Sequence, residues 1–264
     1  MEGKAANNMT YDLTKFDLGD MLSCSLRLRE ATSGAPTLEV SAQRVCRFLY
    51  DELVGPDSGR ACALVRCYKT NAYSSLDEDL QAFAREALGA EKPRPTMKVL
   101  TLMATVGQTA SWNSRHLSRG HRAIPLPSPE IVEKAPMISQ LIKELGLELT
   151  QVLQPTADIV KELAGKRHGV FHVENAPGSP YIPAQQEFVA RFGIRSVLGF
   201  GGMLPSGELF AVILFATVHV PPQAADRFKT LALDVKGAFS KFNEKTVFNQ
   251  IRTPIGESSF RPQE

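Results

Sequence analysis

RSVLGFGGMLPSGELFAVILF, residues 195–215, consists of two apolar runs, with glycines in the first run and a turn sequence between the two. A phosphate-binding loop needs a strand, then glycines, then a helix. Here Pro205, Ser206 and Gly207 supply turn chemistry, because proline presets φ and glycine accepts a positive φ. The second run is rich in β-forming residues. The stretch therefore predicts a β-hairpin, with adjacent antiparallel strands over 194–202 and 208–218, rather than a nucleotide-binding loop.

The sequence on either side of this hairpin alternates between helical and strand-like patterns. Apolar residues at helical spacing, prolines at helix starts and capping residues predict the helices. The predicted helices cover 14–31, 37–54, 76–88, two pieces from Ser128 that divide at Pro136, 156–164, a short one within 179–193, and 222–242. The predicted strands outside the hairpin cover 60–70, 97–106, 122–126 and 169–175.

The hairpin, the proline-initiated loop after it and the helix QAADRFKTLALDVKGAF resemble the C-terminal half of a GAF domain. Further pieces, VRCYKT, SRGHRAIPLPS, PMISQLI and GSPYIPAQQEFV, resemble a bacterial sensor module of the kind found ahead of histidine kinase or cyclase outputs. The resemblance covers 194–240 well and 37–106 loosely, and 107–193 holds more material than a minimal GAF domain. It implies an α/β (α+β) fold, a GAF-like antiparallel five- or six-stranded sheet flanked by helices on both faces.

Three segments are expected along the chain. They are a flexible N-terminus over 1–13, a single GAF-like sensory domain with an N-terminal helical pair over 14–243, and a loose tail over 244–264. The roughly twenty residues after Asn243 cannot hold a kinase, a cyclase or a winged helix. We therefore expect the domain to act through its own dimer or through a separate signalling output protein.

Composition narrows the range of partners. The chain has 264 residues, 43% of them hydrophobic, and a formal net charge of +2. This charge gives no strong attraction to nucleic acid or to anionic lipid. The N-terminal sequence MEGKAANNMTYD has no apolar signal region, and the longest apolar run, LFAVILFA, is too short to span a membrane. We expect a cytoplasmic protein with no nucleic-acid or membrane partner.

Two irregular stretches supply candidate ligand-binding residues. The stretch WNSRHLSRGHRAIPLPS gathers cations before a helix start, where an anion would be stabilised, and its tryptophan could stack on a planar ligand. The alternative is a solvated basic loop with Trp112 packed as an anchor. GSPYIPAQQEFV could form a lid over the pocket, or merely a turn with Tyr181 half buried. The predicted ligand-binding residues are Trp112, Arg115, His121, Arg122, Tyr181, Gln185 and Glu187.

No catalytic residue or metal ligand is predicted, and no cofactor can be named. His168 and His172 lie four residues apart, but nothing in the sequence supplies further metal ligands, so a structural or surface pair is favoured. The cysteines, Cys24, Cys46, Cys62 and Cys67, contain no C-x-x-C pair and fit reduced, buried thiols.

The leading hypothesis is a sensory or regulatory GAF-like module that binds a small, anionic or planar molecule. A homodimer held partly by the helices at 14–31 and 222–242 is expected. One alternative is a thiol enzyme on the same fold, similar to free methionine sulfoxide reductases. The other is a dimerisation scaffold that binds no ligand.

Overall fold

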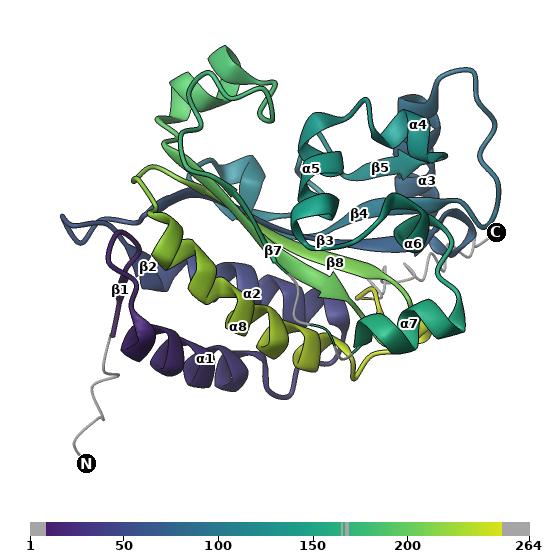
Figure 1. The fold of residues 1–264 in the computed structure, drawn as a ribbon. Helices are drawn as coiled ribbons and strands as arrows, with labels where there is room; N and C mark the ends of the chain where they lie inside the picture. The colour runs from purple at the N-terminus through teal and green to yellow at the C-terminus, as the bar shows by residue number, and fades with distance from the viewer. Residues whose placement is uncertain (1–8, 165, 167–168, 250–264) are drawn as a thin grey trace, which may run out of the picture.

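The computed structural model describes residues 9–164, 166 and 169–249, and it shows a main β-sheet surrounded by helices (Figure 1). In this part of the chain, six strands form an antiparallel sheet in the order β5-β4-β3-β8-β7-β6. Their bounds are β3 Cys62–Ala72, β4 Lys98–Gly107, β5 Ala123–Leu126, β6 Val170–Val173, β7 Ser196–Met203 and β8 Leu209–Ala216. A separate parallel pair joins β1 (Tyr11–Asp12) to β2 (Leu53–Val54).

The predicted hairpin is confirmed. Strands β7 and β8 pair from Ser196 with Ala216 to Met203 with Leu209. Gly207 closes the turn with a φ of 87°, a conformation that glycine adopts at no steric cost. Gly201 meets a different requirement, since a Cβ at this position would lie 2.1 Å from the carbonyl oxygen of Phe210. Gly207 therefore serves the turn, and Gly201 serves the close approach of the two strands.

Eight α-helices and four 3-10 or π-helical segments are present in the described residues. The α-helices are α1 Leu18–Thr32, α2 Leu38–Glu52, α3 Glu78–Leu88, α4 Pro129–Val132, α5 Pro136–Glu144, α6 Leu149–Leu153, α7 Ala157–Ala164 and α8 Pro222–Phe239. The other segments are 3-10 helices at Tyr73–Ser75, Ala110–Asn113 and Glu244–Thr246, and a π-helix at Gln185–Ala190. None of these helices is long and apolar enough to cross a membrane.

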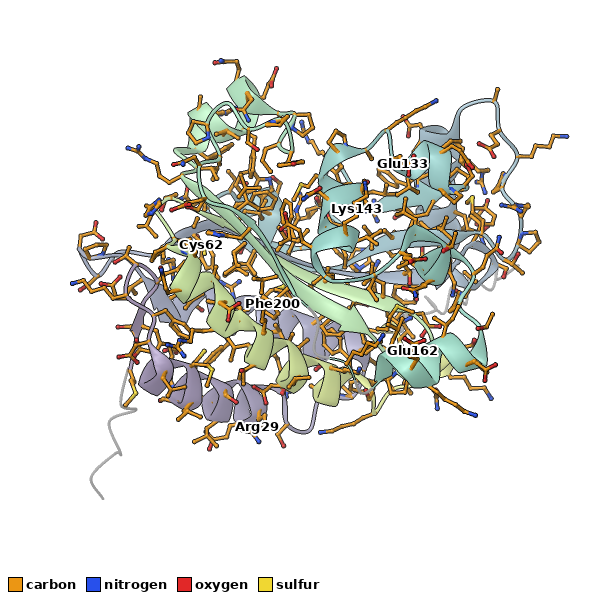
Figure 2. The ribbon with its side chains drawn as sticks, in the orientation of Figure 1. Arg29, Cys62, Glu133, Lys143, Glu162 and Phe200 are labelled. Atoms are coloured by element: carbon orange, nitrogen blue, oxygen red, sulfur yellow. The ribbon has the colours of Figure 1, made fainter. Side chains whose placement is uncertain are left out.

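One face of the sheet is covered by α2 and α8, and α1 packs against both helices (Figure 1). Phe200 of β7 and Phe228 of α8 meet in this layer with ring centroids 5.6 Å apart, and Figure 2 labels Phe200 where the sheet meets α8. Helix α1 begins with a capping box between Asp17 and Asp20. Ser25 of α1 donates a hydrogen bond to Asp234 of α8 at 2.6 Å, which fixes the outer helix to the inner one.

The opposite face is covered by α4, α5, α6, Trp112 and residues of the segment 176–194. Its core includes Leu141 of α5, Phe171 of β6 and Ile213 of β8. Pro136 stands at the first turn of α5, as predicted, where its missing N–H costs nothing. The expected architecture is thus confirmed, an antiparallel sheet with helices on both faces, and the sheet has six strands.

The structure differs from the sequence prediction in details. Residues 11 and 12, assigned to a flexible N-terminus, form β1, because Tyr11 is buried against the core and pairs with Leu53. Residues 244–249, assigned to a loose tail, contain a 3-10 helix and contacts with α2. The remaining parts of those two predictions, 1–8 and 250–264, lie outside the described residues.

Candidate functional site at Arg66

An arginine lies in the middle of the sheet, on the face that α5 covers. Arg66 of β3 pairs with Thr105 of β4 on one side and with Ile213 of β8 on the other. Directly opposed residues of antiparallel strands project to the same face, so these three side chains form a row. Although β3 is a central strand, Arg66 is partly exposed. Solvent therefore reaches a positive charge at the centre of the sheet.

The hydrogen bonds of Arg66 leave part of its guanidinium unused. Nη1 donates to Tyr68 Oη at 3.2 Å and Nη2 donates to Ser118 Oγ at 3.1 Å, both neutral oxygens. Among the described residues, Nε has no partner, and neither does Oγ1 of the fully buried Thr105. Buried polar groups are normally paired, so two orphaned groups at one register position make this a candidate binding site. We call Arg66, Tyr68, Thr105, Ser118 and His121 the Arg66 site.

The segment 114–121 covers this site from the side of β4. Ser118 is almost fully buried, and its hydroxyl joins Arg66 to the carbonyl of Gly120. His121 has a φ of 59°, an uncommon conformation for a non-glycine residue. The pKa of its imidazole lies below the usual value, first because of desolvation and second because of the Arg66 charge. At neutral pH the one strong positive charge of the site is therefore that of Arg66.

Trp112, predicted to stack on a ligand, lies in an aromatic cluster beside the Arg66 site. Its ring centroid is 4.5 Å from that of Phe192 and 5.8 Å from that of Phe188. Its ring also covers Gly107, where a Cβ would come within 2.8 Å of it. Since Gly107 pairs with Leu64, two residues from Arg66 on the same strand, the cluster forms an apolar flank of the site. Trp112 therefore packs against neighbouring side chains, and it lies at the border of the Arg66 site.

The structure does not bring the two predicted arginines to the Arg66 site. Arg115 forms two hydrogen bonds with Glu39 of α2, at 2.8 and 3.2 Å. Arg122 forms an ion pair with Asp79 and lies 4.4 Å above the ring of Phe83. Both guanidinium groups are thus neutralised by carboxylates. Arg66 differs from them because its two bonded partners carry no charge.

The predicted lid residues are placed on the loop and short helix before β7. Gln185 holds the loop together, donating to the carbonyl oxygens of Ala176, Ser179 and Ile182 and accepting from the amide of Gly178. Tyr181 is half buried against the same core that contains Ile213, and Glu187 is exposed. Because the bonds of Gln185 stay within its own loop, its role there is structural, and ligand binding by these three residues stays a prediction.

The cysteines and histidines show no sign of catalytic or metal chemistry in the described residues. All four thiols are buried and free, and burial raises the pKa of Cys24 and Cys62 to about 12 and also raises the pKa of Cys46 and Cys67 well above the usual value. A thiol enzyme needs the opposite shift, because the thiolate is the nucleophile. His172 bonds to the carbonyl of Val220 at 2.9 Å, and His168 lies outside the described residues. No cluster of three metal-binding side chains is found in this part of the chain.

Of two surface depressions on the protein, one lies away from the Arg66 site and the other shares His121 with it. One, of about 370 Å³, is lined by 94, 96–98, 126–130, 150, 153 and 154 at the β4–β5 edge. The other, of about 450 Å³, lies between α3 and β5 and includes His121 and Arg122. The ion pair with Asp79 occupies Arg122 there. Neither depression includes Arg66, and neither combines an arginine lacking a carboxylate partner with a buried, unpartnered hydroxyl.

Sequence reasoning missed Arg66, Thr105 and Ser118. One signal was present, since Arg66 interrupts the apolar strand CALVRCYKT at a central position. The side chains of Thr105 and Ser118 carry no such signal. Only the strand register and the fold of 114–121 bring them to the arginine.

Comparisons with known proteins give matches in structure and none in sequence. No protein-family model and no curated protein matches the chain. In structure it is similar to the GAF domain of a phosphoenolpyruvate-protein phosphotransferase from Coxiella burnetii, at 14% identity and a TM-score of 0.41, over 84% of this chain and 93% of the other. The GAF domain of the Acinetobacter phosphotransferase gives 13% identity and a TM-score of 0.39, over 84% and 93%.

A third similar structure is CepR2 from Burkholderia cenocepacia, an N-acylhomoserine lactone-dependent transcription factor of the LuxR family. It gives 13% identity and a TM-score of 0.35, over 84% of this chain and 96% of the other. These similarities concern the fold alone.

Proposed function

We propose that this protein is a sensory or regulatory module that binds a small anionic molecule at the Arg66 site. The observation that carries the proposal is the partly exposed Arg66 on a central strand, with its Nε and the hydroxyl of Thr105 both unpartnered. Keeping an arginine charge in the middle of a sheet is costly unless an anion pairs with it. A bound anion would satisfy both orphaned groups at once.

The surroundings of Arg66 favour a carboxylate attached to a planar, apolar group. An arginine fork matches the two oxygens of a carboxylate, and the Thr105 hydroxyl adds a third hydrogen bond. Ile213 shares the row of Arg66, and Trp112 lies over the neighbouring row with Phe188 and Phe215 around it. Such a wall stabilises a flat apolar body by burial and ring contact.

The first prediction is that Arg66→Met weakens binding of benzoate about 10- to 100-fold, the range for losing hydrogen bonds to a charged group. Titration calorimetry would compare benzoate, acetate and inorganic phosphate, and native mass spectrometry would show any anion that purifies with the protein. Methionine keeps the unbranched apolar stem of the side chain and removes its charge and its hydrogen-bond donors. Arg60→Met is the matched control, since Arg60 is exposed and paired with Asp51.

Two results would contradict the proposal. One is unchanged benzoate affinity in Arg66→Met. The other is wild-type protein that binds none of the three probes and carries no small molecule after purification.

A homodimer is the second part of the proposal. Leu18, Leu22 and Leu26 are 53%, 56% and 58% exposed and recur every four residues along the outer helix α1. Leu233 of the adjacent α8 is also exposed. A second copy of the chain, placed with its α1 antiparallel, would cover the leucine row and bring the acidic first turn of one helix near the basic last turn of the other. The dimer would then act on a separate output protein.

The second prediction is that Leu22→Glu converts the dimer to a monomer, because it places two like charges at the centre of the apolar contact. Light scattering at high micromolar concentration would measure the mass. Ile131→Glu is the control, because Ile131 is also an exposed apolar residue but lies on α4. This change should leave the dimer intact. A wild-type protein that is monomeric under these conditions would exclude the dimer.

A further inference from the structure

The segment 114–118 is one compact turn of chain. The amides of Leu117 and Ser118 both donate to the carbonyl of Ser114 at 3.1 Å, and the amide of His116 donates to the Ser114 hydroxyl at 3.3 Å. These bonds fix Arg115 and Ser118 relative to each other. A displacement of Ser118 is therefore transmitted to Arg115.

Ser118 is the end of this turn that belongs to the Arg66 site. Its hydroxyl accepts from Arg66 Nη2 at 3.1 Å and donates to the carbonyl of Gly120 at 3.3 Å. The residue is only 3% exposed, so water does not readily replace either partner. The position of the turn thus depends on where Arg66 directs its guanidinium.

Arg115 lies at the other end of the turn 114–118, and its contacts hold residues 247–249 in place. Arg115 binds Glu39 through two hydrogen bonds, and its guanidinium lies 5.2 Å from the ring of Phe248. Glu39 in turn accepts from the amide of Asn249 at 2.9 Å, and its own amide donates to the carbonyl of Val247 at 2.9 Å. We call these five residues the Arg115 clasp.

We propose that the turn 114–118 couples anion binding at the Arg66 site to the docking of residues 247–249 in the Arg115 clasp. The inference rests on the function proposed above. An anion that takes Arg66 Nη2 away from Ser118 removes one of the bonds that hold the turn, and the clasp at its other end loosens. Coupling of this kind is reciprocal, so release of residues 247–249 changes the affinity for the anion by the same factor.

The test measures amide exchange by NMR in anion-free protein. The amides of Asn249 and Glu39 report directly on the clasp, and the amide of Val212 in β8 reports on global unfolding. In Ser118→Ala and Arg66→Met, exchange at both clasp amides should rise about 3- to 10-fold, as expected for loss of one hydrogen bond. Exchange at Val212 should stay unchanged. Ser206→Ala is the matched control, because it removes a serine hydroxyl that bonds to Glu208 in the β7–β8 turn, outside the Arg66 site, and it should leave all three amides as they are.

Unchanged exchange at Asn249 and Glu39 in both variants would overturn the coupling. An equal rise at Val212 would overturn it as well, because the effect would then be global destabilisation. A third arm adds benzoate to the wild-type protein, where saturation should speed exchange at the clasp. If benzoate, acetate and phosphate all fail to bind, the proposed function fails, whereas the comparison of anion-free variants still decides the coupling.

Discussion

Replacing Gly201 with alanine is expected to lower the free energy of unfolding by about 3 kcal/mol or more, the range for severe overpacking in a core. The new Cβ would lie 2.1 Å from the carbonyl oxygen of Phe210 and 2.9 Å from the Cα of Ala211. Both are backbone atoms of the neighbouring strand, so no side chain can move aside. Strands β7 and β8 would have to separate at this position.

Urea denaturation followed by circular dichroism would measure this loss. Gly237→Ala is the matched control, because Gly237 lies within α8 with no atom near the position of a Cβ. Alanine is the better helix former, so this control should gain roughly 0.5–1 kcal/mol. A Gly201→Ala protein as stable as the wild type would show that the two strands do not approach as closely as described.

Replacing Glu39 with alanine is expected to cost about 3 kcal/mol, because it leaves Arg115 buried without its counter-charge. The side chains of Arg115 and Glu39 are 5% and 15% exposed. The same change removes the acceptor for the amide of Asn249, so residues 247–249 lose part of their attachment. Denaturant unfolding would give the total loss.

The matched control for this pair is Asp51→Ala. Asp51 and Arg60 form an ion pair at 2.9 Å, but their side chains are 37% and 56% exposed. Exposed ion pairs contribute little to stability, so the free energy of unfolding should fall by no more than about 1 kcal/mol. Equal effects of the two substitutions would show that burial does not distinguish the pairs.

The hairpin was predictable because its signal is local. Pro205, Ser206 and Gly207 lie between two runs of β-forming residues, and neither the turn nor the pairing depends on distant sequence. The start of α5 at Pro136 was predictable for the same reason. Local signals also gave most of the helices and strands of the fold.

The site was only partly predictable because its partners are distant in the sequence. The basic segment that contains Arg115 and Arg122 resembles an anion site in composition. The carboxylates that pair with these two arginines are, however, 76 and 43 residues away in the sequence. No local pattern shows that these two charges are already neutralised. Conversely, Arg66 acquires Thr105 and Ser118 only through strand register and loop folding.

Helix α1 shows a second limit of periodicity. It carries two apolar rows, one containing Met21, Cys24 and Leu28, and another containing Leu18, Leu22 and Leu26. The first row is buried and the second is exposed. Helical spacing predicts that both exist, but only the packing of α2 and α8 determines which row faces the core.

The order of the sheet has a consequence for how the protein is made. Strand β3 has β8 as one of its two neighbours, and the amide of Leu209 bonds to the hydroxyl of Thr70, 139 residues earlier. At ordinary rates of synthesis, that length of chain takes on the order of 10 s to emerge from the ribosome. During this interval β3 and β4 present an apolar, unpaired edge, which is a template for aggregation. This edge is covered only after β8 has emerged and paired with β3.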